Sequence, residues 1–111
     1  MIEKTVKEYL ELHVDIPVYL EIPADPADKY ILIERTAGGE DDFIESATLA
    51  IQSVSEKSLY NAAVINEDIK NLMRSIVYET NISKCKLNSD YNFTDTVTKK
   101  YRYQAVFNLN Y

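Results

Sequence analysis

The last part of the chain alternates apolar and polar residues with a period of two, which is typical of strands that bury one face. The apolar side of the final segment consists of Tyr101, Tyr103, Ala105, Phe107, Leu109 and Tyr111, and its polar side of Arg102, Gln104, Asn108 and Asn110. The preceding segment has Cys85, Leu87, Tyr91 and Phe93 on its apolar side. These patterns predict an antiparallel hairpin with one face against a core and one polar face.

The longest helical pattern runs from Ser58 to about Glu79, and either Ser55 or Ser58 is expected to cap it. Its apolar positions recur at steps of three and four residues, and they are Leu59, Ala62, Ile65, Ile69, Leu72, Met73 and Ile76. This spacing predicts the main helix, which is the natural cover for the hairpin. A shorter helix is expected over residues 2–13, because apolar side chains share one face there and Pro17 ends the pattern.

Three further strands are expected between the two helices. Residues 17–23 are rich in strand formers and bracketed by prolines, which favours a short strand near a sheet edge. Residues 29–35 read as a buried strand, and residues 43–55 alternate as a half-buried strand does. The sequence therefore predicts one α+β domain over residues 1–111, with a mainly antiparallel or mixed sheet of about five strands packed against one long and one short helix.

The segment Thr36–Asp42 is predicted to be the most distinctive loop. It contains Gly38 and Gly39, the two glycines of the chain, and such a pair indicates unusual backbone dihedrals or a close approach of other atoms. The densest group of carboxylates follows, namely Glu40, Asp41, Asp42 and Glu45. Their spacing does not match an EF-hand loop, and the glycines lack the remainder of a phosphate-binding motif. A solvated acidic loop is the preferred interpretation.

Charge and composition narrow the class of protein. Among 111 residues, 12 Lys and Arg stand against 18 Asp and Glu, and the net charge of −6 argues against a generic nucleic-acid binder. No stretch has the roughly 18 apolar residues of a membrane span, and the first residues lack the apolar core of a signal peptide. We expect a soluble protein with no membrane partner. Cys85 is the single cysteine, which suits a reducing cytoplasm.

Candidate catalytic residues are few. His13 is the single histidine and has no evident local partner, and Cys85 lies on the apolar side of its strand, where a thiol behaves as a small hydrophobe. The tyrosines of the last segment, beside Lys99, Lys100 and Arg102, could form a base-stacking platform, but they share the face expected to meet the core. The sequence assembles no nucleophile, base and oxyanion donor. We therefore expect no enzyme, cofactor or metal, and we expect contact surfaces for other proteins, including the polar strand face of Arg102, Gln104, Asn108 and Asn110.

Four stretches lie in an order and at a spacing that cover nearly the whole chain. They are residues 17–23, 30–39, 47–52 before a helix that contains Ala62 and Ala63, and 101–107. Together they resemble the tail terminator and tail completion proteins of long-tailed bacteriophages, which are also called minor tail or neck proteins. The resemblance implies a virion subunit assembled in the host cytoplasm.

By this resemblance, the subunits would form a ring, usually a homohexamer, on the head-proximal end of the tail tube. The ring would stop tube polymerisation and offer a joining surface to the head–tail connector, while DNA passes through without specific binding. Its lumen or subunit contact would include Gly38, Gly39, Glu40, Asp41 and Asp42. Two alternatives remain open: a neighbouring neck or head-closure protein, and a small cytoplasmic enzyme or metal- or ligand-binding domain that uses the acidic loop.

Overall fold

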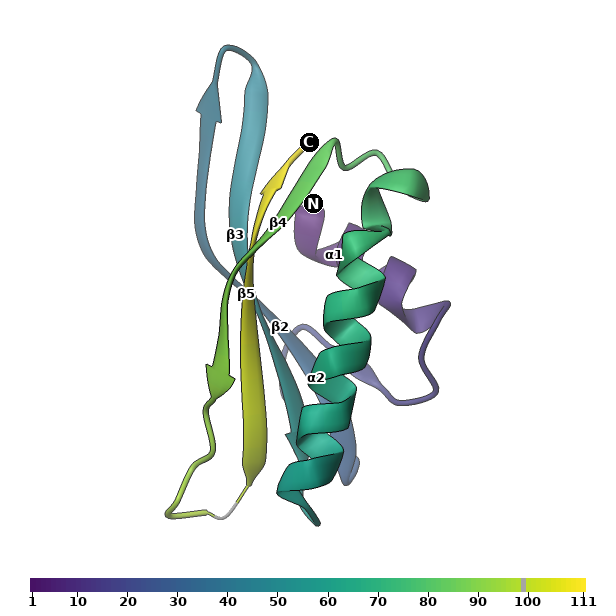
Figure 1. Cartoon of the computed structure of the whole chain (residues 1–111), viewed down its shortest axis with the longest axis vertical. Helices are drawn as coiled ribbons and strands as arrows, with labels where there is room; N and C mark the ends of the chain where they lie inside the picture. Colours follow the sequence, from purple (N-terminus) through teal and green to yellow (C-terminus); the bar gives the residue numbers. More distant parts are fainter. Residues whose placement is uncertain (99) are drawn as a thin grey trace.

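The computed structural model describes residues 1–98 and 100–111 and shows the expected α+β architecture, a mixed and mostly antiparallel sheet with helices packed against it (Figure 1). Lys99, counted above among the basic residues, lies outside the described residues. The strand order is β1-β2-β3-β5-β4; β1 is parallel to β2, and the other neighbours are antiparallel. In chain order the elements are α1 (Ile2–Glu11), β1 (Val18–Tyr19), β2 (Lys29–Asp41), β3 (Ile44–Ser55), α2 (Leu59–Arg74), the 3₁₀ turn η1 (Ile76–Tyr78), β4 (Lys84–Asn92) and β5 (Tyr101–Asn110).

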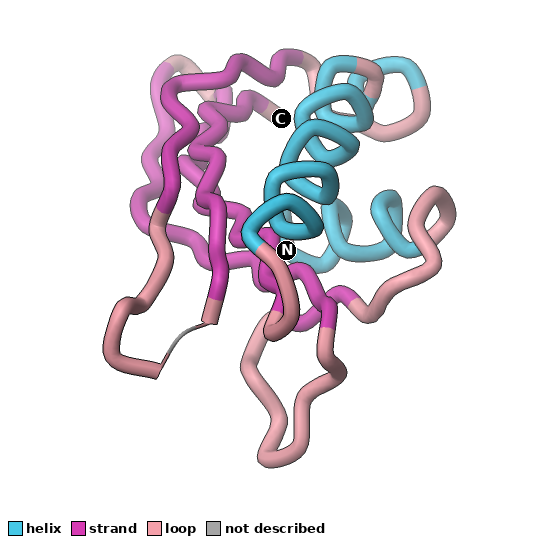
Figure 2. The backbone as a smooth tube through the Cα atoms, turned by 60° about the horizontal axis from the view of Figure 1, so that its bottom comes forward, coloured by secondary structure: helices cyan, strands magenta, loops and turns pink. Residues whose placement is uncertain are grey.

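Both helices lie on the same side of the sheet, so the molecule has two layers (Figure 2). The sides predicted for β5 are confirmed, since Phe107 and Leu109 face the helices. Leu49 and Ile51 of β3 face the helices as well. The core contains Val6, Leu10, Ile31, Ile33, Leu49, Ile51, Ile69, Met73, Ile76, Ala105, Phe107 and Leu109. We call the other side of the sheet the open face. Among the described residues, no helix is long and apolar enough to cross a membrane.

The main helix begins where the sequence indicated and ends earlier. The Ser58 side chain accepts a hydrogen bond from the Asn61 backbone N–H (3.2 Å), which caps the first turn. The α-helix stops at Arg74 instead of near Glu79, because the following backbone tightens into the 3₁₀ turn η1. The apolar spacing continues through this turn, since Ile76 is still buried in the core. Because Ile76 continues the helical spacing of apolar residues, the sequence predicts a longer helix than the structure has.

A β-bulge in β4 corrects the prediction that Tyr91 and Phe93 share the apolar side of Cys85. Leu87 pairs with Phe107, but Ser89 pairs with the next residue of β5, so one extra residue sits in β4. A shift of one residue exchanges the faces of all positions that follow. Tyr91 and Phe93 consequently lie on the open face.

The same bulge turns Asp90 toward α2, where its carboxylate is held by two side chains. The Asn66 amide donates to Asp90 over 3.2 Å, and the Lys70 ammonium lies 3.3 Å away. Lys70 also contacts Glu67 at 2.8 Å, and this hydrogen bond, with a further contribution from Asp90, raises the pKa of Lys70. A partly buried polar cluster therefore fixes α2 over β4.

The predicted loop Thr36–Asp42 is wrong, because β2 continues through it to Asp41. The register shifts between Arg35 and Ala37, where Thr36 forms a bulge, and pairing with β3 then resumes without interruption to Asp41 and Ile44. Glycines and carboxylates have low strand propensity, which explains the incorrect prediction. Pairing with β3 overrides this local preference.

We predict that Ile69→Ala lowers the free energy of unfolding by about 2–5 kcal/mol, because it opens a cavity in a fully buried contact between α2 and the sheet. Val64→Ala, on the exposed side of the same helix, is the matched control and should change stability by less than about 0.5 kcal/mol. Urea denaturation followed by circular dichroism measures both. Equal losses would contradict the two-layer packing.

Candidate functional site

The most prominent surface feature is the hairpin formed by the end of β2 and the start of β3. It rises beyond the helices at one end of the molecule (Figure 1, top), whose longest dimension is 44 Å. All residues from Glu34 to Asp41 are exposed, in contrast to the buried residues 30–33 of the same strand. The β2 side of the hairpin is therefore held by strand pairing, whereas Ala47 on the β3 side, opposite Gly38, still belongs to the core.

A two-residue turn, Asp42 and Phe43, closes the hairpin between Asp41 and Ile44. Both turn residues have positive φ angles, 50° and 68°, as in type I′ turns. This backbone is favourable for Asn-Gly and unfavourable for a bulky residue such as Phe. The Phe43 side chain is 95% exposed, and Ile44 beside it is 52% exposed. An aromatic and an aliphatic side chain thus stand together in solvent at the tip.

The glycine pair does not supply the turn. Neither Gly38 nor Gly39 has a positive φ, so the expectation of unusual dihedrals is wrong. The expectation of close approach is confirmed at Gly38, where an added Cβ would lie 2.0 Å from Nη2 of Arg35. The Arg35 guanidinium crosses this glycine and lies 4.0 Å from the Glu3 carboxylate of α1. A Cβ at Gly39 would lie 3.4 Å from Ser46 Oγ, which is close to an ordinary contact.

The acidic residues are distributed along both strands and the turn. Glu40 is opposite Glu45, Asp41 is opposite Ile44, and Asp42 lies in the turn. All four carboxylate side chains are exposed. In the described ranges, no group of three or more His, Cys, Asp or Glu side chains is placed to hold a metal ion. The end of the hairpin therefore presents two apolar side chains, Phe43 and Ile44, on a negatively charged surface.

The polar residues of β5 divide into two places on the open face. Asn108 is exposed and accepts a hydrogen bond from the Thr48 hydroxyl (3.1 Å), and half-buried Asn110 pairs with Ser46. Through β3 these two asparagines border the glycine pair. They line a shallow depression of about 290 Å³ with Ala37, Gly38, Ser46, Ala47, Thr48 and Leu109.

Arg102 and Gln104 lie at the other end of β5 and are half-buried instead of exposed. The Arg102 guanidinium lies 4.9 Å from the centre of the Phe93 ring, and the Gln104 amide donates to the Tyr91 hydroxyl. Phe93 and Tyr91 lie on the open face because of the bulge in β4. Of these four polar residues of β5, Asn108 and Asn110 adjoin the hairpin, and Arg102 and Gln104 do not.

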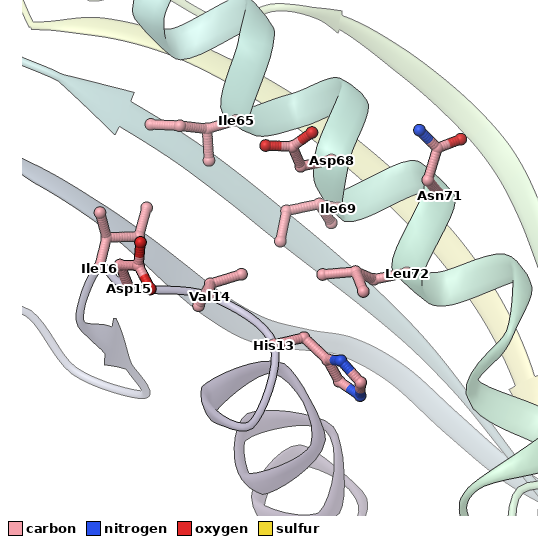
Figure 3. Close-up of a pocket in the computed structure, with 9 residues that line it drawn as sticks. All are labelled: His13, Val14, Asp15, Ile16, Ile65, Asp68, Ile69, Asn71 and Leu72. Atoms are coloured by element: carbon pink, nitrogen blue, oxygen red, sulfur yellow. The ribbon is translucent and has the colours of Figure 1, made fainter.

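A second concavity, of about 480 Å³, lies between the segment after α1 and the side of α2 (Figure 3). Its apolar side chains are Val14, Ile16, Ile65, Ile69 and Leu72. Asp15 and Asp68 border it, but the His13 imidazole points away from both carboxylates (Figure 3). His13 instead lies 3.2 Å from the Glu79 carboxylate, so a partner exists that the sequence did not reveal. These groups do not converge on one reacting atom.

Cys85 is half-buried against the core, as its place in the alternation suggested. Burial raises the pKa of its thiol to about 11. Because the thiolate is the reactive form, this environment suppresses nucleophilic chemistry near neutral pH.

Phe43 and Ile44 are the surface residues that sequence reasoning missed. They are the first two residues of the predicted strand 43–55, and their apolar character fits the alternation expected of a half-buried strand. The available signal was the uninterrupted strand pattern after Asp42, which allows a two-residue turn, but the preceding glycines indicated a longer loop. Phe43 is exposed because the pairing between β2 and β3 ends at Asp41 and Ile44. The composition of the segment does not determine this end point.

Comparison with models of known protein families gives no match, and comparison with curated protein sequences gives none either. The functional argument therefore rests on the residues and geometry described above.

We predict that Gly39→Ala raises the free energy of unfolding by about 0.5–1 kcal/mol, since its strand backbone accepts a side chain. Gly38→Ala should gain less, because its Cβ displaces the Arg35 guanidinium from Glu3. In an Arg35→Ala background the two substitutions should give the same gain. A double-mutant cycle from urea denaturation measures the coupling, expected to be about 0.5–1 kcal/mol. Zero coupling would contradict the contact.

We predict that iodoacetamide modifies Cys85 of the folded protein at pH 8 about a hundredfold more slowly than Cys85 of the urea-unfolded chain, since the raised pKa lowers the thiolate fraction. The rate should increase about tenfold per pH unit until the pH approaches 11, where the thiol ionises. Mass spectrometry of quenched samples measures both rates. Similar rates at pH 8 would show that the thiol is not shielded.

Proposed function

We propose that this chain is a structural subunit, not an enzyme, and that it acts as a bacteriophage tail terminator. In this proposal a ring of subunits, expected to be hexameric, caps the head-proximal end of the tail tube. The ring stops tube polymerisation and provides the surface to which the head connector or neck proteins join. The order and spacing of the stretches that resemble this family support the assignment.

The observation that carries the proposal is Phe43, a strained and exposed aromatic residue at the end of a projecting hairpin. Positive φ at such a residue costs about 1–3 kcal/mol, and a side chain that is 95% exposed gains little packing energy in return. Burial of Phe43 and Ile44 against another protein would offset this cost, since burying a large apolar side chain contributes about 1.5–3 kcal/mol.

The charge around the tip supports the same role. Glu40, Asp41, Asp42 and Glu45 surround the apolar pair, and the whole chain has a net charge of −6. A partner surface with an apolar pocket and a basic rim complements such a tip. Carboxylates that remain uncovered repel a phosphate backbone, which suits a ring through which DNA passes without binding.

We predict that the protein added to growing tail tubes stops their elongation and forms one ring at one end of each tube. Negative-stain electron microscopy measures tube length and the position of the ring. A subunit found instead between the connector and a separate tube cap would indicate the neighbouring head-closure role. Deletion of the gene should give tails of uncontrolled length that fail to join heads. Normal tails joined to heads in the deletion would refute the proposal.

We predict that Phe43→Gly separates the stability of the subunit from its assembly. The free energy of unfolding should stay equal to that of the parent or increase by up to about 1 kcal/mol, because glycine accepts positive φ. Capping of tubes should be lost, because the apolar tip is removed. Tyr60→Ala removes an aromatic side chain that is 76% exposed on α2 and is the control expected to cap normally. Normal capping by Phe43→Gly would contradict a contact role for the tip.

A further inference from the structure

Two strand edges of the sheet are without a neighbour in the described part of the chain. On the outer side of β2, β1 pairs only with Ile31 and Leu32, so β2 has no second neighbour from Ile33 to Asp41. β4 forms the opposite border of the sheet and pairs only with β5. Unpaired N–H and C=O groups at such edges accept a further strand readily.

The regular segments of the two edges lie at the same level along the strand direction. In β2 this segment is Ala37–Asp41, which follows the bulge, and in β4 it is Lys84–Leu87, which precedes the bulge. The pairing registers connect them across the sheet in two rows. One row is Gly39, Ser46, Asn110 and Lys84, and the next is Ala37, Thr48, Asn108 and Lys86.

Strand direction allows the two edges to pair between copies. Three successive antiparallel pairings separate β2 from β4, so β2 and β4 run in opposite directions. A rotation axis parallel to the strands preserves every strand direction from one copy to the next. β4 of the next copy would therefore lie antiparallel to β2, at the same height and with no shift along the strand. Repetition of this head-to-tail contact closes into a ring.

Side chains at the two edges are complementary in charge and size. With the rows aligned, Lys84 of one copy meets Gly39 of its neighbour, one diagonal step from Asp41, which is within reach of a long side chain. Gly39 has no side chain to obstruct the lysine stem. Asp41 lies on the same face of the sheet as Lys84 and Lys86 of the neighbouring copy, whereas Glu40 lies on the other face. Pairing of a β2 edge with a second β2 edge, or of β4 with β4, would place like charges together.

We propose that the segment Ala37–Gly39 of one subunit adds as an antiparallel strand to Lys84–Lys86 of a second copy, so that the sheet continues from subunit to subunit. This inference rests on the proposed ring and specifies its subunit interface. The glycine pair then acts at the interface, where the small residue Gly39 admits the neighbouring lysine.

Disulfide cross-linking tests the interface in the full chain. The variant Gly39→Cys/Lys84→Cys carries Cys85→Ala, so that only the introduced thiols react. Within one copy these positions are three strand spacings apart, about 14 Å, which is too far for a disulfide. Oxidation at high protein concentration should therefore give a ladder of covalent dimers, trimers and higher species on a non-reducing gel. Circular dichroism checks that each variant is folded.

Two matched variants in the same background set the controls. Gly39→Cys/Ser89→Cys keeps the same strands but places the second thiol beyond the β4 bulge, so it should give no ladder. Lys84→Cys alone should remain monomeric. Dimers from that single variant would show β4-to-β4 pairing and would overturn the head-to-tail interface, as would a Gly39→Cys/Lys84→Cys protein without a ladder.

Electron microscopy of the parent protein with tail tubes distinguishes this inference from the proposed function. Rings on tube ends without the Gly39–Lys84 ladder would refute the edge pairing and leave the tail terminator role in place. A ladder from a protein that never caps tubes would refute that role and leave the interface in place. The second aligned row gives the cross-linking pair Ala37→Cys/Lys86→Cys. A ladder from this pair that Lys84→Glu weakens, by placing a second carboxylate beside Asp41, would confirm the contribution of charge.

Discussion

The central strand β3 is the constraint on which the rest of the structure depends. It pairs with β2 on one side and with β5 on the other, and its second half is buried on both faces. Leu49 and Ile51 face the helices, while Ala50 and Gln52 are buried on the open face. A shift of β3 by one residue would exchange these sets. The register of β3 therefore fixes which residues of the hairpin, and of β5, can lie beside one another.

Much of this arrangement is readable in the sequence, because burial on one side of a sheet imposes a period of two. The alternation of β5, including Val106 as an apolar residue on the polar side, predicts its two faces correctly. The start of α2 is likewise encoded locally, since the hydroxyl of Ser58 caps it. The end of that helix is less certain because a 3₁₀ turn preserves the apolar spacing at Ile76.

The features of the structure that the sequence does not predict depend on how neighbouring strands pair. A bulge adds one residue whose effect is visible only against a partner strand, so neither Thr36 nor the extra residue in β4 could be located. The sequence predicts a loop at the glycine pair, whereas the structure has a strand in which the Arg35 side chain occupies the space beside Gly38. The exposed aromatic tip was missed for a related reason: its backbone strain arises from where β2 and β3 close. The acidic character of the site, by contrast, needed only the sequence.

The bulge in β4 also limits how far a neighbouring strand can extend, and this has a consequence for cooperativity. The proposed junction covers about three residues on each side and would be weak by itself, so two subunits alone would separate readily. In a closed ring each subunit is held by two such junctions, and removing one subunit breaks both. In the proposed ring, incomplete forms would be sparsely populated, and a tube end that gathers subunits would be the template on which the complete ring becomes the stable species.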